Sequence, residues 1–321
     1  MDVVLNLLIV NLLQGFLYAV LALGVYITYS ILDFPDLSVD GTVPLGAVVS
    51  ALLIPRGVNP WISLLAAFAA GAAAGCVTGL LHVKLHIRPL LCGIIVMTGL
   101  LSVNLVIMKA GTGGQSIASL FQERTVVNSA PITLLPDNLG GFLKLRTLLL
   151  MAVIAVACKA LLDWYFSTRS GLMLRAAGDN SGFVTQLARD PGRYKVLGLM
   201  LGNGFAALAG ALIVQEKGAA DLQFGTGMVV HGLAAVIIGV SLLRRARFLR
   251  ETTKVIVGSV IYSLCLSIAD AMNLSDYMKL IMAALFVIAL VASDRLDREG
   301  GRRAKRVKSG KETVPKGGDA E

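Results

Sequence analysis

Long apolar runs separated by short polar stretches form the dominant pattern of this chain. A bilayer core about 30 Å thick requires about 20 helical residues. Runs of this kind occupy residues 4–32, 60–82, 88–109, 146–166, 194–214, 254–272 and 278–294, and two shorter runs occupy 43–54 and 228–243. The pattern therefore predicts an all-α fold, a polytopic transmembrane helix bundle with about nine membrane segments, two of them short or broken.

One polar stretch, DFPDLSVDGTVPLG at residues 33–46, lies between two apolar runs and contains three aspartates, two prolines and two glycines. A second stretch, from Ala220, repeats its order: an Asp-Leu pair, a Gly-Thr pair, and a short apolar run with a glycine near its start. The corresponding residues are Asp36 and Asp221, Gly41 and Gly225, and Gly46 and Gly232. We expect two matching broken-helix elements that border a cavity. Chance similarity of apolar sequence, or simple helix capping by the aspartates, is the alternative.

The composition agrees with a membrane protein, because 56% of the 321 residues are hydrophobic and 15% are charged, against about 25% charged in soluble domains. The net charge of +9 does not indicate nucleic-acid binding, since 21 of the 29 Lys and Arg residues lie in polar stretches between or after the apolar runs, at 82–88, 167–195, 244–254 and 295–321. Their excess of Lys and Arg predicts that these stretches are cytoplasmic, with the N-terminus outside and the C-terminus inside. The two broken elements then have opposite orientations, as in a pseudo-inverted repeat.

The chain divides into a transmembrane permease domain at residues 1–294 and a basic tail at residues 295–321, which we expect to be disordered. The tail is interpreted as a solvated orientation signal, with lipid-headgroup contact as the alternative. The four cysteines lie in apolar runs and are expected to be buried and unpaired. Small residues recur every four positions in 60–82 and 194–214, which favours close helix packing in lipid.

The longest predicted cytoplasmic connection is the stretch 167–195. Its segment SGFVTQLA, starting at Ser181, predicts a short amphipathic helix with Asn180 or Ser181 as its N-cap and Asp190–Gly192 as its stop. Arg175, Arg189 and Arg193 are expected to surround this helix. A short helix at a membrane surface would suit the docking of a soluble partner.

Three segments resemble permease subunits of ABC importers of the branched-chain amino acid and ribose type. They are GFLYAVLALGVYITYSILDFPDLSVDGTVPLGAVVSALL at 15–53, RSGLMLRAAGDN at 169–180, and LGNGFAALAGALIVQEKGAAD at 201–221. Within this family the chain is most similar to the tryptophan/tyrosine-type permeases. It departs from the branched-chain type at 239–254, where GVSLLRRARFLRETTK stands in place of a glycine-rich turn.

The resemblance implies a pore formed by two permease copies, expected to be a homodimer, with two ABC ATPase subunits docked on the 167–195 loops. It also implies an extracytoplasmic solute-binding protein, with membrane lipid around the bundle. It assigns ATPase coupling to the loop residues Arg175, Asp179, Asn180, Gly182, Leu187 and Arg189.

Candidate chemistry within the chain is sparse. No GxxxxGK[ST] phosphate loop occurs, so ATP hydrolysis is expected on a partner and no cofactor is expected. His82 and His86 have a zinc-compatible spacing without a third ligand nearby, so a hydrated pair at a helix end is favoured and no metal is expected. The candidate pore-lining residues are Asp40, Asn104, Asn203 and His231. For His231, packing inside the bundle is an equal alternative.

Two functions compete with an ATP-driven importer of a small, amino acid-like solute. A stand-alone ion-coupled secondary transporter would share the inverted repeat, but would favour carboxylates at the membrane midplane and would not need the basic loop 167–195. An assembly scaffold or receptor would leave the repeated broken elements without a purpose.

Overall fold

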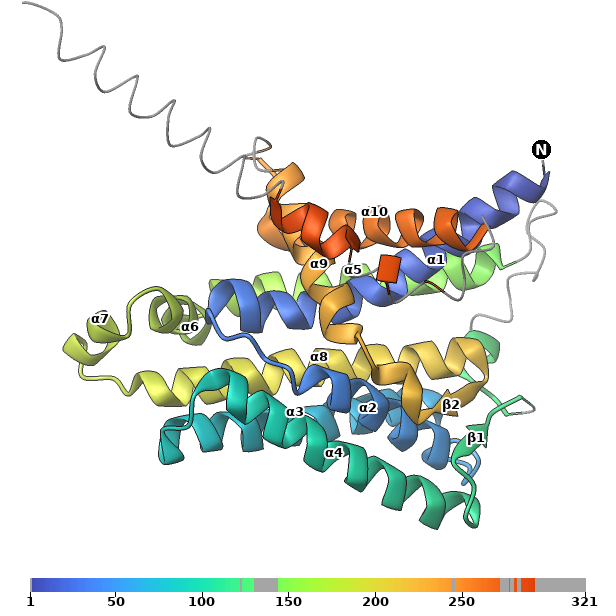
Figure 1. The fold of residues 1–321 in the computed structure, drawn as a ribbon, viewed down its shortest axis with the longest axis horizontal. Helices are drawn as coiled ribbons and strands as arrows, with labels where there is room; N and C mark the ends of the chain where they lie inside the picture. Colours follow the sequence, from blue (N-terminus) through green and yellow to red (C-terminus); the bar gives the residue numbers. More distant parts are fainter. Residues whose placement is uncertain are drawn as a thin grey trace, which may run out of the picture.

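A computed structural model describes residues 2–121, 123–129, 144–243, 246, 248–271, 277, 280–281 and 284–291. The long helices lie side by side and give the bundle one long direction (Figure 1). They are α1 (Asp2–Val25), α3 (Pro60–Leu85), α4 (Pro89–Thr112), α5 (Leu145–Ser167), α8 (Pro191–Lys217) and α10 (Glu251–Ala271). Two shorter apolar helices, α2 (Val39–Leu53) and α9 (Met228–Leu242), lie among them. The predicted all-α membrane bundle is confirmed.

Seven segments in the described residues are long and apolar enough to cross a membrane, among them the composite segment Leu222–Leu242. Helix α2 is too short to cross alone. The sequence also predicts a last segment at 278–294, of which residues 284–291 are helical and a part lies outside the described residues. The predicted tail at 295–321 lies entirely outside them.

The two ends of the bundle carry different small elements (Figure 1). At one end, helices α6 (Arg169–Asp179) and α7 (Ser181–Gln186) join α5 to α8. At the other end, strands β1 (Ile117–Ser119) and β2 (Ala219–Asp221) form an antiparallel ribbon, in which Ala118 pairs with Ala220. We refer to these as the coupling-loop end and the ribbon end. Short 3₁₀ turns, η2 (Val126–Asn128) and η4 (Leu222–Gly225), complete the ribbon end.

The helices pack as an inverted repeat. In one half α1 precedes the broken element that contains α2, and in the other half α8 precedes the broken element that contains α9. Each of these two helices packs against the short helix of the other half. Helix α8 packs against α2 and α3, and α1 packs in the same way against α9 and α10. Helix α2 runs toward the ribbon end, whereas α9 runs away from it (Figure 1). The matched glycines occupy matched contacts: a Cβ at Gly46 would collide with the Ala207 carbonyl of α8, and a Cβ at Gly232 would collide with Val25 of α1.

Helix α8 is the centre of the packing, because its small residues let three helices approach its backbone. A Cβ at Gly71 or Gly75 of α3 would meet the carbonyls of Asn203 and Leu199, and one at Gly210 of α8 would meet the carbonyl of Val43 in α2. Such close approach replaces the hydrophobic effect, which does not hold helices together in lipid. The small-residue spacing in 60–82 and 194–214 thus corresponds to one real interface.

The structure corrects three boundaries. Helix α2 begins at Val39, so Asp40 and Gly41 belong to its first turn and not to an unwound stretch. Stretch 167–195 contains a second helix, α6, that the sequence did not predict. Asp190 does not stop α7, because its side chain accepts a hydrogen bond from the N–H of Gly192 and caps the start of α8. Helix α7 ends earlier, before Ala188 at φ 55°.

Replacing Gly46 by alanine should destabilise the bundle, because the added methyl group has no space against the α8 backbone. Overpacking of this kind costs about 1–3 kcal/mol, which corresponds to a fall of about 3–8 °C in the apparent melting temperature. Thermal unfolding of the detergent-solubilised protein measures this. Gly99→Ala is the matched control, since a Cβ at Gly99 meets nothing within 4 Å. Equal melting temperatures for the two variants would contradict the packing described here.

Candidate functional site

The chain turns back into the bundle after α1 through a π-helical turn, η1 (Tyr26–Ile31). Asp33 follows with a left-handed backbone (φ 50°), which aspartate tolerates better than most residues. The N–H of Phe34 then donates to the carbonyl of Thr28 (2.9 Å). The segment that leads from here to α2 is irregular, and it carries Asp36 into the protein interior. Irregular backbone at membrane depth requires such cover.

Asp36 anchors a buried polar network on the middle of α8. Its Oδ2 accepts a hydrogen bond from Asn203 Nδ2 (2.7 Å), and its Oδ1 accepts one from the backbone N–H of Ser38 (2.9 Å). The Oδ1 of Asn203 lies 3.1 Å from Ser38 Oγ and 2.7 Å from Thr42 Oγ1. All four side chains are buried. Because an unsatisfied polar group in such surroundings is costly, this network fixes the start of α2 against α8.

Asp40 joins the two broken elements directly. It lies in the first turn of α2, and its carboxylate accepts hydrogen bonds from the backbone N–H groups of Gly227 (3.1 Å) and Val229 (2.7 Å) at the start of α9. A carboxylate is favourable there, because the first N–H groups of a helix lack partners and carry partial positive charge. The α9 N-terminus is thus occupied by a side chain of the other half and does not face an open cavity.

The approach of the two elements depends on Pro44 and Gly225. Pro44 has no N–H, so the carbonyl of Asp40 cannot form the usual hydrogen bond within α2. Gly225, the last residue of η4, packs against this carbonyl and against the Pro44 ring, where a Cβ would collide with both. Proline and glycine therefore create the contact surface between the halves at this point.

The other broken-element residues take less central positions. Asp221 is exposed in β2, and its Oδ1 accepts from the N–H of Gln223 (3.0 Å), which repeats the local turn that Asp36 makes with Ser38. Gly41 packs against Met97 and Leu100 of α4. The resemblance between the two stretches is thus local as well as topological, but only the first aspartate is buried.

The four candidate pore-lining residues lie at different depths. Asp40 is partly exposed, whereas Asn104, Asn203 and His231 are buried within the chain. Asn104 Nδ2 donates to the carbonyl of Gly41 (2.9 Å). The His231 ring lies between Tyr18 (centroids 4.0 Å apart) and Tyr262 (4.7 Å). Of the two possibilities for His231, the structure favours packing inside the bundle.

Helix α7 projects from the coupling-loop end (Figure 1). Asn180 is its N-cap and accepts from the N–H of Phe183 (3.2 Å). Val184 is buried and attaches the helix to the protein, while Phe183 and Leu187 are 51% and 46% exposed. Phe183 lies on this six-residue helix and Leu187 is its C-cap residue, so two large apolar side chains are exposed together at the surface, where such groups favour contact with another protein. We name Phe183 and Leu187 the α7 apolar pair.

The remaining loop residues divide into two groups. Asp179, Gly182 and Arg189 are exposed near α7. Arg175 instead contacts α5, with its guanidinium carbon 4.7 Å from the centre of the Phe166 ring. Gly178 of α6 packs against the Ile31 carbonyl of η1, where a Cβ would collide. The loop therefore contacts the turn that leads to Asp36.

Three buried residues of these networks escaped the sequence analysis. Ser38 and Thr42 look like ordinary small polar residues, although their spacing of four from each other already placed them on one helix face. Gln215 links α2, α3 and the ribbon end: its Nε2 donates to Ser50 Oγ (2.9 Å) and its Oε1 accepts from the N–H of Val126 (2.9 Å). A single Gln near the end of an apolar run does not by itself indicate such a network in the sequence.

His82 and His86 do not share a ligand position. The Nδ1 of His82 lies 2.9 Å from the Ile87 carbonyl, and His86 is the left-handed C-cap of α3. Among the residues that the structure describes, no group of three His, Cys, Asp or Glu side chains is placed to hold a metal ion. The four cysteines are free; Cys92 and Cys158 are buried, as expected, whereas Cys76 and Cys265 are only partly buried.

Replacing Asp40 by asparagine should loosen the start of α9, because one amide oxygen replaces a carboxylate that accepts two N–H groups. Loss of such a cap costs about 1–2 kcal/mol, so amide exchange at Gly227–Val229 should accelerate about 5- to 30-fold. Hydrogen-exchange mass spectrometry of this segment measures the change. Asp221→Asn is the control, since it caps only its own exposed turn. Unchanged exchange in the Asp40 variant would refute the cap.

Comparison with known proteins yields one family and several named relatives. Residues 7–290 match the family described as branched-chain amino acid transport system / permease component. The chain is 39% identical over 285 residues to the tyrosine transport system permease protein of Clostridioides difficile (strain R20291), which covers 88% of this chain and 90% of the relative. It is 26% identical over 267 residues to the ribose import permease protein of Escherichia coli (strain K12), covering 81% and 76%.

A third relative, the autoinducer 2 import system permease protein of Enterobacter sp. (strain 638), is 31% identical over 210 residues, covering 65% of this chain and 56% of the relative. No solved structure gives a significant match. The family match includes both broken elements, the coupling loop and the membrane segments around them. The chain therefore belongs to the branched-chain amino acid transport system permease family, the membrane subunits of ABC importers.

Proposed function

We propose that this permease carries an amino acid, with tyrosine as the first candidate, through a pathway that passes the junction of α2 and α9. The observation that carries the proposal is the Asp40 cap, which joins the starts of two oppositely directed short helices inside a bundle of this family. The relative named a tyrosine transport system permease protein supports the solute class. Partner ATPase and solute-binding subunits follow from the family.

Asp40 is our candidate for a residue that lines the pathway. Asn104, Asn203 and His231 are buried within the chain and would stabilise the structure around it. Asp40 is the partly exposed member of the four, so a pathway that it lines runs along the surface of one chain. A second copy would close this surface, which supports a homodimer with the pathway between its subunits. The buried Asp36–Asn203 network would then hold the lining of the pathway in position.

The coupling loop offers a direct mechanical route from a partner to this junction. The α7 apolar pair is exposed for docking, α6 packs on η1 through Gly178, and η1 leads into the segment that carries Asp36. A push on α7 would therefore move η1 and, through it, the start of α2. Transport by alternating access requires two packings of the bundle whose relative stability the ATPase changes.

The proposed orientation places the coupling-loop end in the cytoplasm and the ribbon end outside. It rests on the basic residues of 167–195 and on Arg250, which lines the same pocket as Arg175 at this end of the bundle. The N-terminus is then outside. A solute-binding protein would meet the ribbon end, where β1 and β2 are joined. The transmembrane unit would extend over 1–294, with the basic tail 295–321 beyond it.

The function is tested by reconstituting the chain in liposomes with its ATPase and binding-protein subunits. Labelled tyrosine should accumulate when ATP is supplied to the ATPase and should not accumulate when ATP is replaced by a sodium or proton gradient. Unlabelled tyrosine should compete, and ribose should not. Gradient-driven uptake without the ATPase would favour an ion-coupled transporter, and failure of labelled tyrosine to accumulate when ATP is supplied would reject the proposed solute.

Replacing Leu187 by aspartate should weaken ATPase association, because a half-exposed leucine would be buried at the docking site. Burial of such a side chain contributes about 1.5–3 kcal/mol, so the dissociation constant should rise about 10- to 100-fold. Pull-down or interferometry with the purified ATPase measures it. Ile117→Asp, at the ribbon end and 54% exposed, is the matched control. Equal affinities would place docking elsewhere.

Replacing Gly178 by alanine should separate docking from transport. The added methyl group would push α6 away from the Ile31 carbonyl while leaving α7 unchanged. ATPase association should stay near the wild-type value, and solute transported per ATP hydrolysed should fall severalfold. Gly99→Ala is the control, since its methyl group would meet nothing within 4 Å. Wild-type transport by the Gly178 variant would rule out this route.

A further inference from the structure

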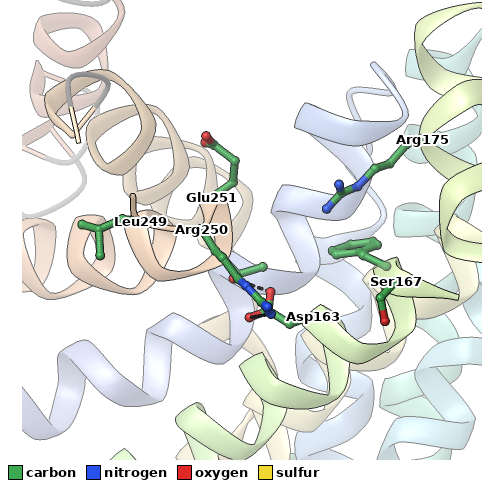
Figure 2. Close-up of a pocket in the computed structure, with 8 residues that line it drawn as sticks. Asp163, Ser167, Arg175, Leu249, Arg250 and Glu251 are labelled. Carbon is green, nitrogen blue, oxygen red and sulfur yellow. Dashed lines mark hydrogen bonds and ion pairs between the residues drawn. The ribbon is translucent and has the colours of Figure 1, made fainter. Parts of the chain in front are cut away.

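A pocket of about 370 Å³ opens at the coupling-loop end, away from the junction of α2 and α9. Its lining comes from the end of α5, from α6, and from the start of α10 (Figure 2). Six of the lining residues matter below: Asp163, Phe166, Arg175, Leu249, Arg250 and Glu251. The pocket therefore lies where the coupling loop meets the second half of the repeat.

The carboxylates of this pocket are already paired. Asp163 accepts from Lys159 Nζ (2.9 Å) and from Thr252 Oγ1 (2.7 Å), and Arg250 Nη1 lies 3.1 Å from its Oδ2. Glu251 accepts from Lys254 Nζ (2.8 Å). Three cations, Lys159, Arg250 and Lys254, are paired with these two carboxylates, and Arg175 in the lining adds a further positive charge. An anion would meet little repulsion here.

The two arginines retain donors for a ligand. The guanidinium carbon of Arg175 lies over the Phe166 ring, 4.7 Å from its centre, a cation–π contact that does not use the N–H groups as hydrogen-bond donors. Within the described part of the chain, no carboxylate forms an ion pair with it. Arg250 uses one nitrogen on Asp163 and is 70% exposed in its side chain. Guanidinium groups bind phosphate oxygens through pairs of parallel hydrogen bonds.

Two exposed aromatic residues that are close in sequence to lining residues indicate the level of the membrane surface: Trp164 follows Asp163, and Phe248 is two positions before Arg250. Trp164, one turn before the end of α5, is 68% exposed, and Phe248, just before α10, is 87% exposed. Exposed Trp and Phe beside Arg are typical of the boundary between acyl chains and headgroups. The first N–H groups of α10, from Glu251, add a further preference for an anion. A soluble anion would not require the apolar margin.

We propose that this pocket binds the phosphate of an anionic phospholipid, with Arg175 and Arg250 on the phosphate and with Trp164 and Phe248 against its acyl chains. A bound lipid would connect α6 of the coupling loop with α10 of the second half. The proposal is independent of the transported solute. It differs from a general membrane attraction, because it requires two named guanidinium groups on one headgroup.

The test measures lipid binding to the purified full-length protein in detergent by native mass spectrometry. Wild-type protein should bind phosphatidylglycerol at least about tenfold more tightly than phosphatidylcholine with the same acyl chains. Arg175→Gln and Arg250→Gln should each lower the affinity for phosphatidylglycerol about fivefold, as expected for one basic residue near a charged lipid. Arg189→Gln, an exposed arginine of the same loop, should lower it less than about twofold.

Two further measurements keep the result interpretable. Arg175→Lys keeps the charge and the fold but loses the forked geometry, so its affinity should lie between the wild-type and glutamine values. Inorganic phosphate in large excess should displace phosphatidylglycerol only weakly. Equal losses in the Arg175, Arg250 and Arg189 variants would overturn the site. Competition by inorganic phosphate as strong as by the lipid would overturn the lipid as the ligand and assign a soluble anion.

Discussion

The interaction on which the structure depends is the contact of a carboxylate with a helix start in the middle of an apolar bundle. Asp40 of α2 occupies the N-terminus of α9 through two backbone hydrogen bonds, and Asn203 ties the segment before α2 to α8. In a bilayer no water is available to replace these partners. Two broken helices are therefore stable only together, and movement of one changes the partners of the other.

This dependence connects the architecture to transport. The first helix of each half packs on the other half, so α1 and α8 hold the two broken elements in one unit. The coupling loop contacts that unit at η1, and the pocket lined by Arg175 and Arg250 contacts it at α10. A partner at α7 and a lipid in the pocket would act on opposite halves of the same repeat. The permease needs no catalytic side chain for this, only two packings of similar stability.

Several features were evident from the residues before any fold was known. The apolar periodicity identified the membrane bundle, and the paired stretches from Pro35 and Ala220 identified the inverted repeat. Glycine spacing identified the helix faces that approach closely. Sequence reasoning misplaced the end of α7, because an Asp-Pro pair can stop one helix or start the next, and only the backbone at Ala188 decides between them.

The sequence by itself determined that the chain spans a membrane and to which family it belongs, since these follow from local composition, spacing and motif. Only the tertiary structure decided what each polar residue does. Asp40 caps the start of α9 by accepting a hydrogen bond from Val229, which is 189 positions away in the sequence. His231 packs between two tyrosines. A buried polar residue in lipid must find a partner, but sequence does not state which, because that choice depends on how distant helices cross.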